Sequence, residues 1–366
     1  MKCNDIILIG DIMNRRIVKI GELLTGEKNN ICDVSGVLVG HSTIKTDKIH
    51  TGVTAILPHN GNIFKEKVVA SSYSYNGFGK SMGLVQIEEL GTIETPILLT
   101  NTLNIGKVSD ALISYKLKRN PEIGVTTSTV NPIVCECNDG SINDIQKRAV
   151  EEKNVYEAIE SVSSDFEQGD IGAGCGMKCH GFKGGIGSSS RVLSIDGNKY
   201  TVGVLVNSNF GSSNGKDLIF KGRQLGPLIK NYNNKQEEDK GSIIVVIATD
   251  IPLDYRQLKR VCKRAEIGIG RTGSYAGNGS GDIMIAFSTK NHVFHFNEKA
   301  IENIERFNDD NINIVFKAVV EATEEAVLNS LLFSHSTISY DGKYIKSLME
   351  YKELFEDLLY TGESND

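Results

Sequence analysis

The chain has 366 residues, of which 40% are hydrophobic and 23% are charged, as in an ordinary globular enzyme rather than a disordered or fibrous protein. Its net charge of -6 provides no general basic field, so nucleic acid is not expected as a partner and small neutral or zwitterionic substrates fit better. No apolar stretch approaches the roughly 18 residues that a membrane span requires. The N-terminal segment has only a short apolar run followed by arginines, and we expect a cytoplasmic protein.

Apolar runs of strand length alternate with amphipathic helical patterns along the chain. Helical periodicity is clear at residues 108–115, again at 258–265, and most strongly at 315–332. Strands are expected at 201–206, 243–248 and 283–287, and the continuous apolar character of the second predicts a strand buried on both faces. The pattern favours mixed sheets covered by helices.

A glycine-rich segment, residues 172–187, does not match a phosphate or dinucleotide loop, because GAGCGM lacks the full GxGxxG pattern and FKGGIGSSSR matches no P-loop. Cys175, Cys179 and His180 in this segment could be read as soft metal ligands. No second pair stands at ligand spacing, however, and the seven cysteines of the chain are odd in number and form no CxxC pair. We therefore expect neither a metal, nor another cofactor, nor a disulfide framework.

The stretch NYNNKQEEDKG, residues 231–241, is polar and charged and ends abruptly at Ser242, where the apolar run IIVVIA begins. It is typical of an exposed linker. A domain boundary is one interpretation, but such a linker usually leads into a turn or a helix cap rather than into a buried strand. Cleavage between Gly241 and Ser242 explains the junction better, since it would place a serine hydroxyl and a free amine together at the tip of a strand.

Seven segments in order along the chain then resemble the DmpA-like L-aminopeptidase/D-esterases and related β-aminopeptidases. They are ICDVSGVLVGHSTI (31–44), GVTAILPHNGN (52–62), NGFGK (76–80), ELGTIETPILLTNTL (89–103), GAGCGMKCHGFKGGIGSSSR (172–191), GSIIVVIATD (241–250) and NGSGDIMIAFST (278–289). The resemblance implies an α+β fold, a four-layer αββα sandwich like that of N-terminal-nucleophile hydrolases. It also implies a single domain over residues 1–366, cut by the protein itself into an α chain (1–241) and a β chain (242–366), and assembly of these heterodimers into a homo-oligomer.

A serine at a new N-terminus carries its own base. An α-amine has a reference pKa of about 7.7–8.0, so part of it is neutral near pH 7 and able to take the proton of the Ser242 hydroxyl. No histidine is then required, and the histidines lie in no recognisable Ser-His-Asp context. His41, His59 and His180 are therefore interpreted as structural.

The resemblance assigns roles to four more residues. Ser280 and Asp282, in a glycine-flanked loop before an apolar strand, would orient Ser242 and stabilise its protonated amine; otherwise NGSGD is an ordinary turn. Asn209, just after the strand predicted to end at Val206, would donate a hydrogen bond to the oxyanion, although an asparagine there could also cap a turn.

Glu136 would hold the free amino group of the substrate. Relatives place a tyrosine in the same stretch as a second polar donor, whereas this chain has Asn138 and Ser141 there.

The sequence thus predicts a self-processing aminopeptidase that acts on small peptides or amino-acid amides through an acyl-enzyme on Ser242. A non-catalytic or nucleotide-binding protein that retains the sandwich is the alternative from another class. A related autocleaving acyltransferase is a third hypothesis.

Overall fold

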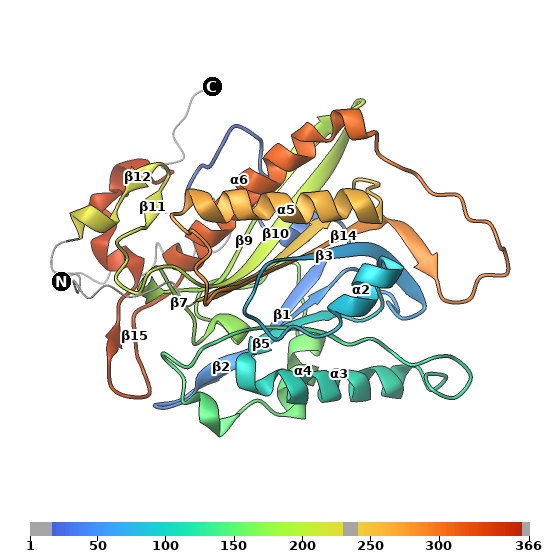
Figure 1. The fold of residues 1–366 in the computed structure, drawn as a ribbon, viewed down its shortest axis with the longest axis horizontal. Coiled ribbons are helices and arrows are strands. Elements are labelled where there is room, and N and C mark those ends of the chain that lie inside the picture. Colours follow the sequence, from blue (N-terminus) through green and yellow to red (C-terminus); the bar gives the residue numbers. More distant parts are fainter. Residues whose placement is uncertain (1–16, 230–240, 361–366) are drawn as a thin grey trace.

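Two β-sheets lie face to face between two pairs of helices in the computed structural model, which describes residues 17–229 and 241–360 (Figure 1). The larger sheet has six strands in the order β4-β3-β14-β13-β10-β9, and the smaller has four in the order β1-β2-β5-β6. Neighbouring strands are antiparallel except in two parallel pairs, β13 with β14 and β5 with β6. The four layers are those of the predicted αββα sandwich.

The strands of the six-stranded sheet are β3 (Glu66–Gly77), β4 (Thr92–Ile93), β9 (Gly185–Ile195), β10 (Asn198–Asn209), β13 (Ser242–Thr249) and β14 (Gly281–Phe294). Those of the four-stranded sheet are β1 (Leu38–Lys45), β2 (His50–Leu57), β5 (Ile97–Asn101) and β6 (Ile133–Cys137). Three small hairpins are formed by β7 (Lys178–Cys179) with β8 (Phe182–Lys183), β11 (Ile219–Phe220) with β12 (Arg223–Gln224), and β15 (Thr337–Ile338) with β16 (Tyr344–Ile345). The α-helices are α2 (Leu84–Leu90), α3 (Ile105–Arg119), α4 (Glu152–Glu160), α5 (Tyr255–Arg271) and α6 (Asn313–Leu332).

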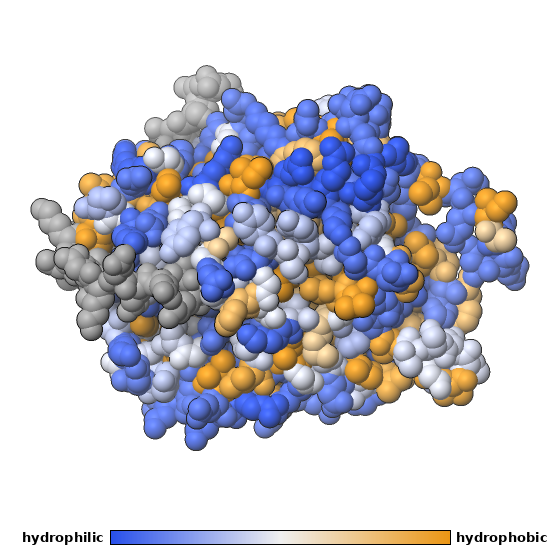
Figure 2. Space-filling model, viewed as in Figure 1, coloured by the Kyte–Doolittle hydropathy of each residue, from blue (hydrophilic) through white to orange (hydrophobic). Residues whose placement is uncertain are grey.

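Helices α5 and α6 cover the outer face of the six-stranded sheet, and α3 and α4 cover that of the four-stranded sheet (Figure 1). Helix α5 begins where the Asp254 carboxylate accepts a hydrogen bond from the backbone N–H of Gln257. Its apolar stripe, which includes Leu258, Val261 and Ala265, is buried against the sheet. Its opposite side carries exposed Arg256 and Lys263, and hydrophilic residues dominate this part of the surface in Figure 2.

Helix α6 is buried almost all round, including its three acidic residues, Glu321, Glu324 and Glu325. The fully buried guanidinium of Arg191 on β9 lies 3.2 Å from a carboxylate oxygen of Glu321 and 2.8 Å from one of Glu325. Such pairing is what makes a buried charge tolerable. No helix among the described residues is both long enough and apolar enough to span a bilayer.

Strand β13 is the centre of the packing. Ile243, Val245 and Ile247 point into the apolar layer under α5 and α6, whereas Ile244 and Val246 point into the layer between the sheets. Because successive side chains of a strand face opposite ways, a strand between two apolar layers must be apolar throughout. The prediction that residues 243–248 are buried on both faces is therefore confirmed.

The other predicted helices and strands fall within α3, α5, α6, β10 and β14, but two boundaries were wrong. Strand β10 continues to Asn209, so Asn209 does not follow the strand; its pairing with β13 extends as far as Ser242. Asp282 likewise lies inside β14 rather than in a loop, because β13 and β3 flank β14 from Gly281 onward. The predicted linker lies outside the described residues, apart from Gly241.

Candidate active site

Ser242 is the first residue of β13, at one end of an inner strand of the larger sheet. Its side chain is buried, with the residue 5% exposed. In the antiparallel pairing it stands opposite Asn209 of β10, and in the parallel pairing it stands beside Gly281 of β14. The two neighbouring strands thus bring Asn209 on one side, and Ser280 and Asp282 on the other, to the strand end that carries the predicted nucleophile.

The side-chain amide of Asn209 is held in one orientation. Its Oδ1 accepts a hydrogen bond of 2.9 Å from the backbone N–H of Lys178, and its Nδ2 donates one of 3.0 Å to the backbone carbonyl of Asn138. Nδ2 also lies 3.5 Å from the Oγ of Ser242. Because an amide nitrogen carries two hydrogens, one remains for an oxygen next to Ser242, as an oxyanion donor requires.

Ser280 and Asp282 are bonded to each other on the other side of Ser242. The Ser280 hydroxyl donates to Oδ1 of Asp282 over 2.6 Å, and both residues are almost fully buried. The structure therefore brings together the two residues that the resemblance paired. That they orient Ser242 stays a prediction.

Glu136 reaches the same region from β6 of the smaller sheet. One of its oxygens accepts a hydrogen bond of 2.8 Å from the backbone N–H of Lys80, and the other accepts one from the Thr102 hydroxyl. A Cβ placed on Gly79 would lie 3.7 Å from Glu136 and 3.8 Å from the Cα of Gly281. A single glycine thus lies between the carboxylate and the strand that flanks Ser242.

The peptide bond between Gly241 and Ser242 is packed closely against β10. A Cβ on Gly241 would lie 2.2 Å from the carbonyl oxygen of Asn209 and 2.2 Å from the Cα of Phe210, so only glycine fits. The carbonyl oxygen of Gly241 accepts a hydrogen bond of 3.3 Å from the backbone N–H of Gly281. The predicted scissile carbonyl is therefore already held by a donor.

Comparison with known proteins bears directly on this site. The model of peptidase family S58 matches residues 29–345. The chain belongs to this family. The β-peptidyl aminopeptidase BapA of Sphingosinicella microcystinivorans is 36% identical over 348 residues, covering 88% of this chain and 86% of that protein.

Solved structures of other proteins share the fold. A protein of Pyrococcus horikoshii is 50% identical with a TM-score of 0.87, and the match covers 92% of this chain and 96% of that protein. The L-aminopeptidase D-Ala-esterase/amidase of Ochrobactrum anthropi, described as a variant of the Ntn hydrolase fold, is 34% identical with a TM-score of 0.86, covering 95% and 98%. The predicted family and fold class are both confirmed.

Two residues of the site were missed by sequence reasoning. The thiol of Cys137 hydrogen-bonds with Ser242, and burial raises its pKa well above the usual range, so it stays a neutral neighbour of the nucleophile. Asp139 is fully buried two residues further on, although NDG in the sequence reads as an exposed turn. The alternation of residue types over 133–137 was the available signal for Cys137, since it turns Cys135 and Cys137 towards the other sheet.

The histidines make contacts that agree with structural roles. Nδ1 of His41 lies 2.9 Å from the Thr54 hydroxyl, and Nε2 of His59 lies 2.8 Å from the carbonyl of Glu66. Burial lowers the pKa of His180 to about 4. Within residues 17–229 and 241–360, no three His, Cys, Asp or Glu side chains are grouped as a metal site would need, Cys175 and Cys179 included.

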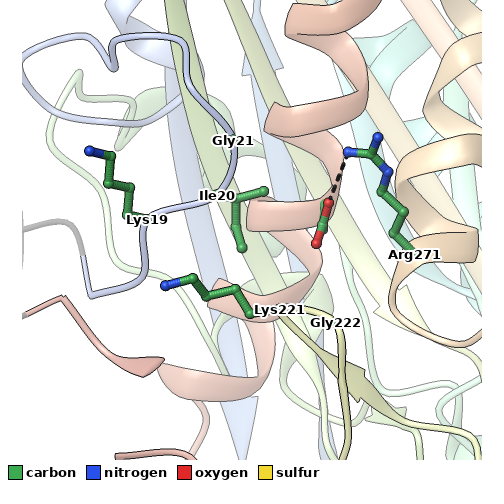
Figure 3. Close-up of a pocket in the computed structure, with 7 residues that line it drawn as sticks. Lys19, Ile20, Gly21, Lys221, Gly222 and Arg271 are labelled. Carbon is green, nitrogen blue, oxygen red and sulfur yellow. Dashed lines mark hydrogen bonds and ion pairs between the residues drawn. The ribbon is translucent and has the colours of Figure 1, made fainter. Parts of the chain in front are cut away.

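A cavity of about 370 Å³ lies elsewhere, beside the β11–β12 hairpin (Figure 3). Lys19, Lys221 and Arg271 line it, and Arg271 is paired with Glu324 at 3.3 Å. None of the predicted site residues is part of this lining. The cavity therefore does not mark the catalytic centre.

Proposed function

We propose that the chain cleaves itself between Gly241 and Ser242 and then uses Ser242 to hydrolyse N-terminal aminoacyl amide or ester bonds of small peptides. The observation that carries this proposal is the position of Ser242, with an oriented amide of Asn209 3.5 Å from its Oγ and the preceding carbonyl held by Gly281. The names of the relatives, β-peptidyl aminopeptidase and L-aminopeptidase, support the substrate class. The two fragments would remain one domain, because β13 of the second lies between β10 and β14 in the same sheet.

Self-cleavage would begin with attack of the Ser242 Oγ on the carbonyl carbon of Gly241. The bond from Oγ to this carbon forms, the bond from the carbon to the Ser242 nitrogen breaks, and the hydroxyl proton passes to that nitrogen. Negative charge develops on the Gly241 oxygen, where the Gly281 N–H already donates at 3.3 Å. Water then hydrolyses the ester, leaving a carboxylate on Gly241 and a free amine on Ser242.

In turnover the free amine of Ser242 would serve as the base. It takes the proton from Oγ as Oγ attacks the substrate carbonyl, and it returns this proton to the leaving amine. The second hydrogen of Asn209 Nδ2 would stabilise the oxyanion, and the Ser280–Asp282 pair would stabilise the amine when it is protonated. Water then releases the acyl group from Ser242.

Substrate selection would rest on Glu136. Glu136 is 4% exposed, and the described partners of its carboxylate, the Lys80 N–H and the Thr102 hydroxyl, are both neutral donors. A substrate ammonium group would supply the missing counter-charge, as expected for an enzyme that needs a free amino terminus.

We also propose that the processed heterodimers assemble into a homo-oligomer in the cytoplasm, without nucleic acid or membrane as partner. Support comes from exposed apolar side chains at the end of β14 and beyond it, Phe294, Phe296, Ile301 and Ile304, the last of which is 61% exposed. Size-exclusion chromatography with light scattering tests the assembly.

The alanine variant of Ser242 tests the mechanism. Ser242→Ala removes the oxygen that attacks in both reactions, so self-cleavage and hydrolysis should both stop. Ser242→Cys should keep self-cleavage, since a thiol can make the same acyl shift. An alanine variant that still splits at this bond and hydrolyses an aminoacyl p-nitroanilide would require another nucleophile.

A further inference from the structure

The orientation of the Asn209 amide depends on the loop that follows β6. The 3.0 Å hydrogen bond from Nδ2 to the carbonyl of Asn138 fixes one hydrogen, and so directs the other towards Ser242. Asn138 itself is exposed, and its side chain only caps its own turn, accepting a 2.9 Å hydrogen bond from the N–H of Gly140. Something else must therefore hold the Asn138 carbonyl in place.

The next residue, Asp139, anchors this loop. It is fully buried, its Oδ2 accepts a hydrogen bond of 3.0 Å from Asn101, and its Oδ1 accepts one of 3.0 Å from Asn143. The Thr51 hydroxyl is a third donor, and these bonds oppose the burial that raises the pKa of Asp139 to about 6. Three donors around one side chain suit a carboxylate, which only accepts hydrogen bonds.

The chain packs closely against Asp139, and its hydrogen-bond partner Asn101 is itself held by other bonds. A Cβ on Gly176 would lie 2.7 Å from the Asp139 Cβ, so the chain packs against it on that side. Asn101 is also fixed, because its Oδ1 accepts from both the backbone N–H and the side-chain amide of Asn104 while its Nδ2 donates to Thr51 and Asp139. The pattern of donors and acceptors from Asn104 to Asp139 is thus determined throughout.

We infer that Asp139 is a positioning residue for the oxyanion donor: through the Asn138 carbonyl it keeps the Asn209 amide directed at Ser242. This inference rests on the proposed function. It predicts that Asp139 affects the rate of acyl transfer rather than the binding of the substrate amino group, which Glu136 provides from another part of the site.

Asp139→Asn tests the inference with almost no change in shape. Asn101 and Asn143 both donate hydrogen bonds to Asp139, and the NH₂ group of the new amide must face at least one of them. Two donors then face each other, so the loop must shift. Removing an oxyanion donor costs about 10²–10³ in kcat, so misdirecting one should cost about tenfold to hundredfold. The KM for an aminoacyl p-nitroanilide should stay within about threefold.

A swap of donor and acceptor provides the matched control. In the double variant Asn101→Asp with Asp139→Asn, the new carboxylate accepts from the new amide and still accepts from Asn104, so kcat should recover. Asn101→Asp alone places two carboxylates together and should be impaired. If Asp139→Asn fails to fold, Asn143→Ala, which removes one donor to Asp139 together with the acceptor of the His50 backbone N–H, should lower kcat to a smaller extent.

The outcomes separate this inference from the proposed function. The rates of the Asp139, Asn101 and Asn143 variants are measured on protein already cleaved before Ser242, and Ser242→Ala, which should stay uncleaved, is the inactive control. Hydrolysis by Ser242→Ala overturns the proposed function. An inactive Ser242→Ala together with unchanged kcat in Asp139→Asn, or in Asn143→Ala, overturns only the role of Asp139. The role of Asp139 is also overturned if the double variant folds but its kcat stays as low as that of Asp139→Asn. A change in Asp139→Asn that is confined to KM overturns it too.

Discussion

Replacement of Glu136 by glutamine isolates the charge of the proposed ammonium site. Glutamine retains an oxygen to accept the Lys80 N–H, and the Thr102 hydroxyl can rotate to accept from the new NH₂ group. The fold should therefore persist, while the buried negative charge is lost. A charge-assisted hydrogen bond contributes roughly 1.5–3 kcal/mol, which corresponds to a tenfold to hundredfold fall in kcat/KM for substrates with a free amine.

The assay compares an aminoacyl p-nitroanilide with its N-acetyl derivative for the parent and Glu136→Gln, both confirmed as cleaved at Ser242. The acetylated compound should be a poor substrate for the parent and change little in the variant. Glu94→Gln is a matched control, because Glu94 is equally buried but is paired with Lys67 at 2.7 Å. Equal losses on both substrates would assign Glu136 to catalysis or structure, and no loss on either would remove it from the site.

Two further predictions follow from the polar pair and from a buried histidine. Ser280→Ala and Asp282→Ala should each give processed protein with clearly reduced hydrolysis, measured as kcat/KM; activity within about twofold of the parent would mean that the pair is only structural. His180 is fully buried, and none of the described residues bonds to its ring nitrogens. Burial lowers its pKa to about 4, below the value of about 6.5 expected in the unfolded chain, so the unfolded state binds the proton more readily between these values. The unfolding free energy of the parent should therefore be at its full value above pH 6.5 and fall towards pH 4, by an amount on the order of a few kcal/mol for this group. His180→Asn, which tolerates the left-handed backbone at φ 48°, should fall less steeply in denaturant titrations; parallel curves would show that His180 does not titrate in this way.

The sequence predicted the parts of the fold that depend on local pattern. The apolar run at 243–248 predicted a strand between two apolar layers, and the periodicity at 315–332 predicted a helix, which the structure buries almost all round. Ser242, Ser280 and Asp282 came from motifs within short segments. The structure unites them because β13 and β14 are parallel neighbours in matched register.

The remaining features depend on contacts between distant segments. Nothing near Asn209 in the sequence shows that Lys178 and Asn138 fix its amide. Asp139 reads as a turn residue because turns favour aspartate, and its burial depends on Asn101, 38 residues away. The strand boundaries at Asn209 and Asp282 were misplaced for the same reason, since cross-strand pairing overrides the local preference of asparagine and aspartate for turns.

The most direct test of self-cleavage is N-terminal sequencing of the purified protein after denaturing electrophoresis. We predict two fragments, of which the smaller begins at Ser242 and the larger ends at Gly241 by mass. A stable single chain with full amidase activity would contradict the account, because an uncleaved Ser242 has no α-amine to act as its base.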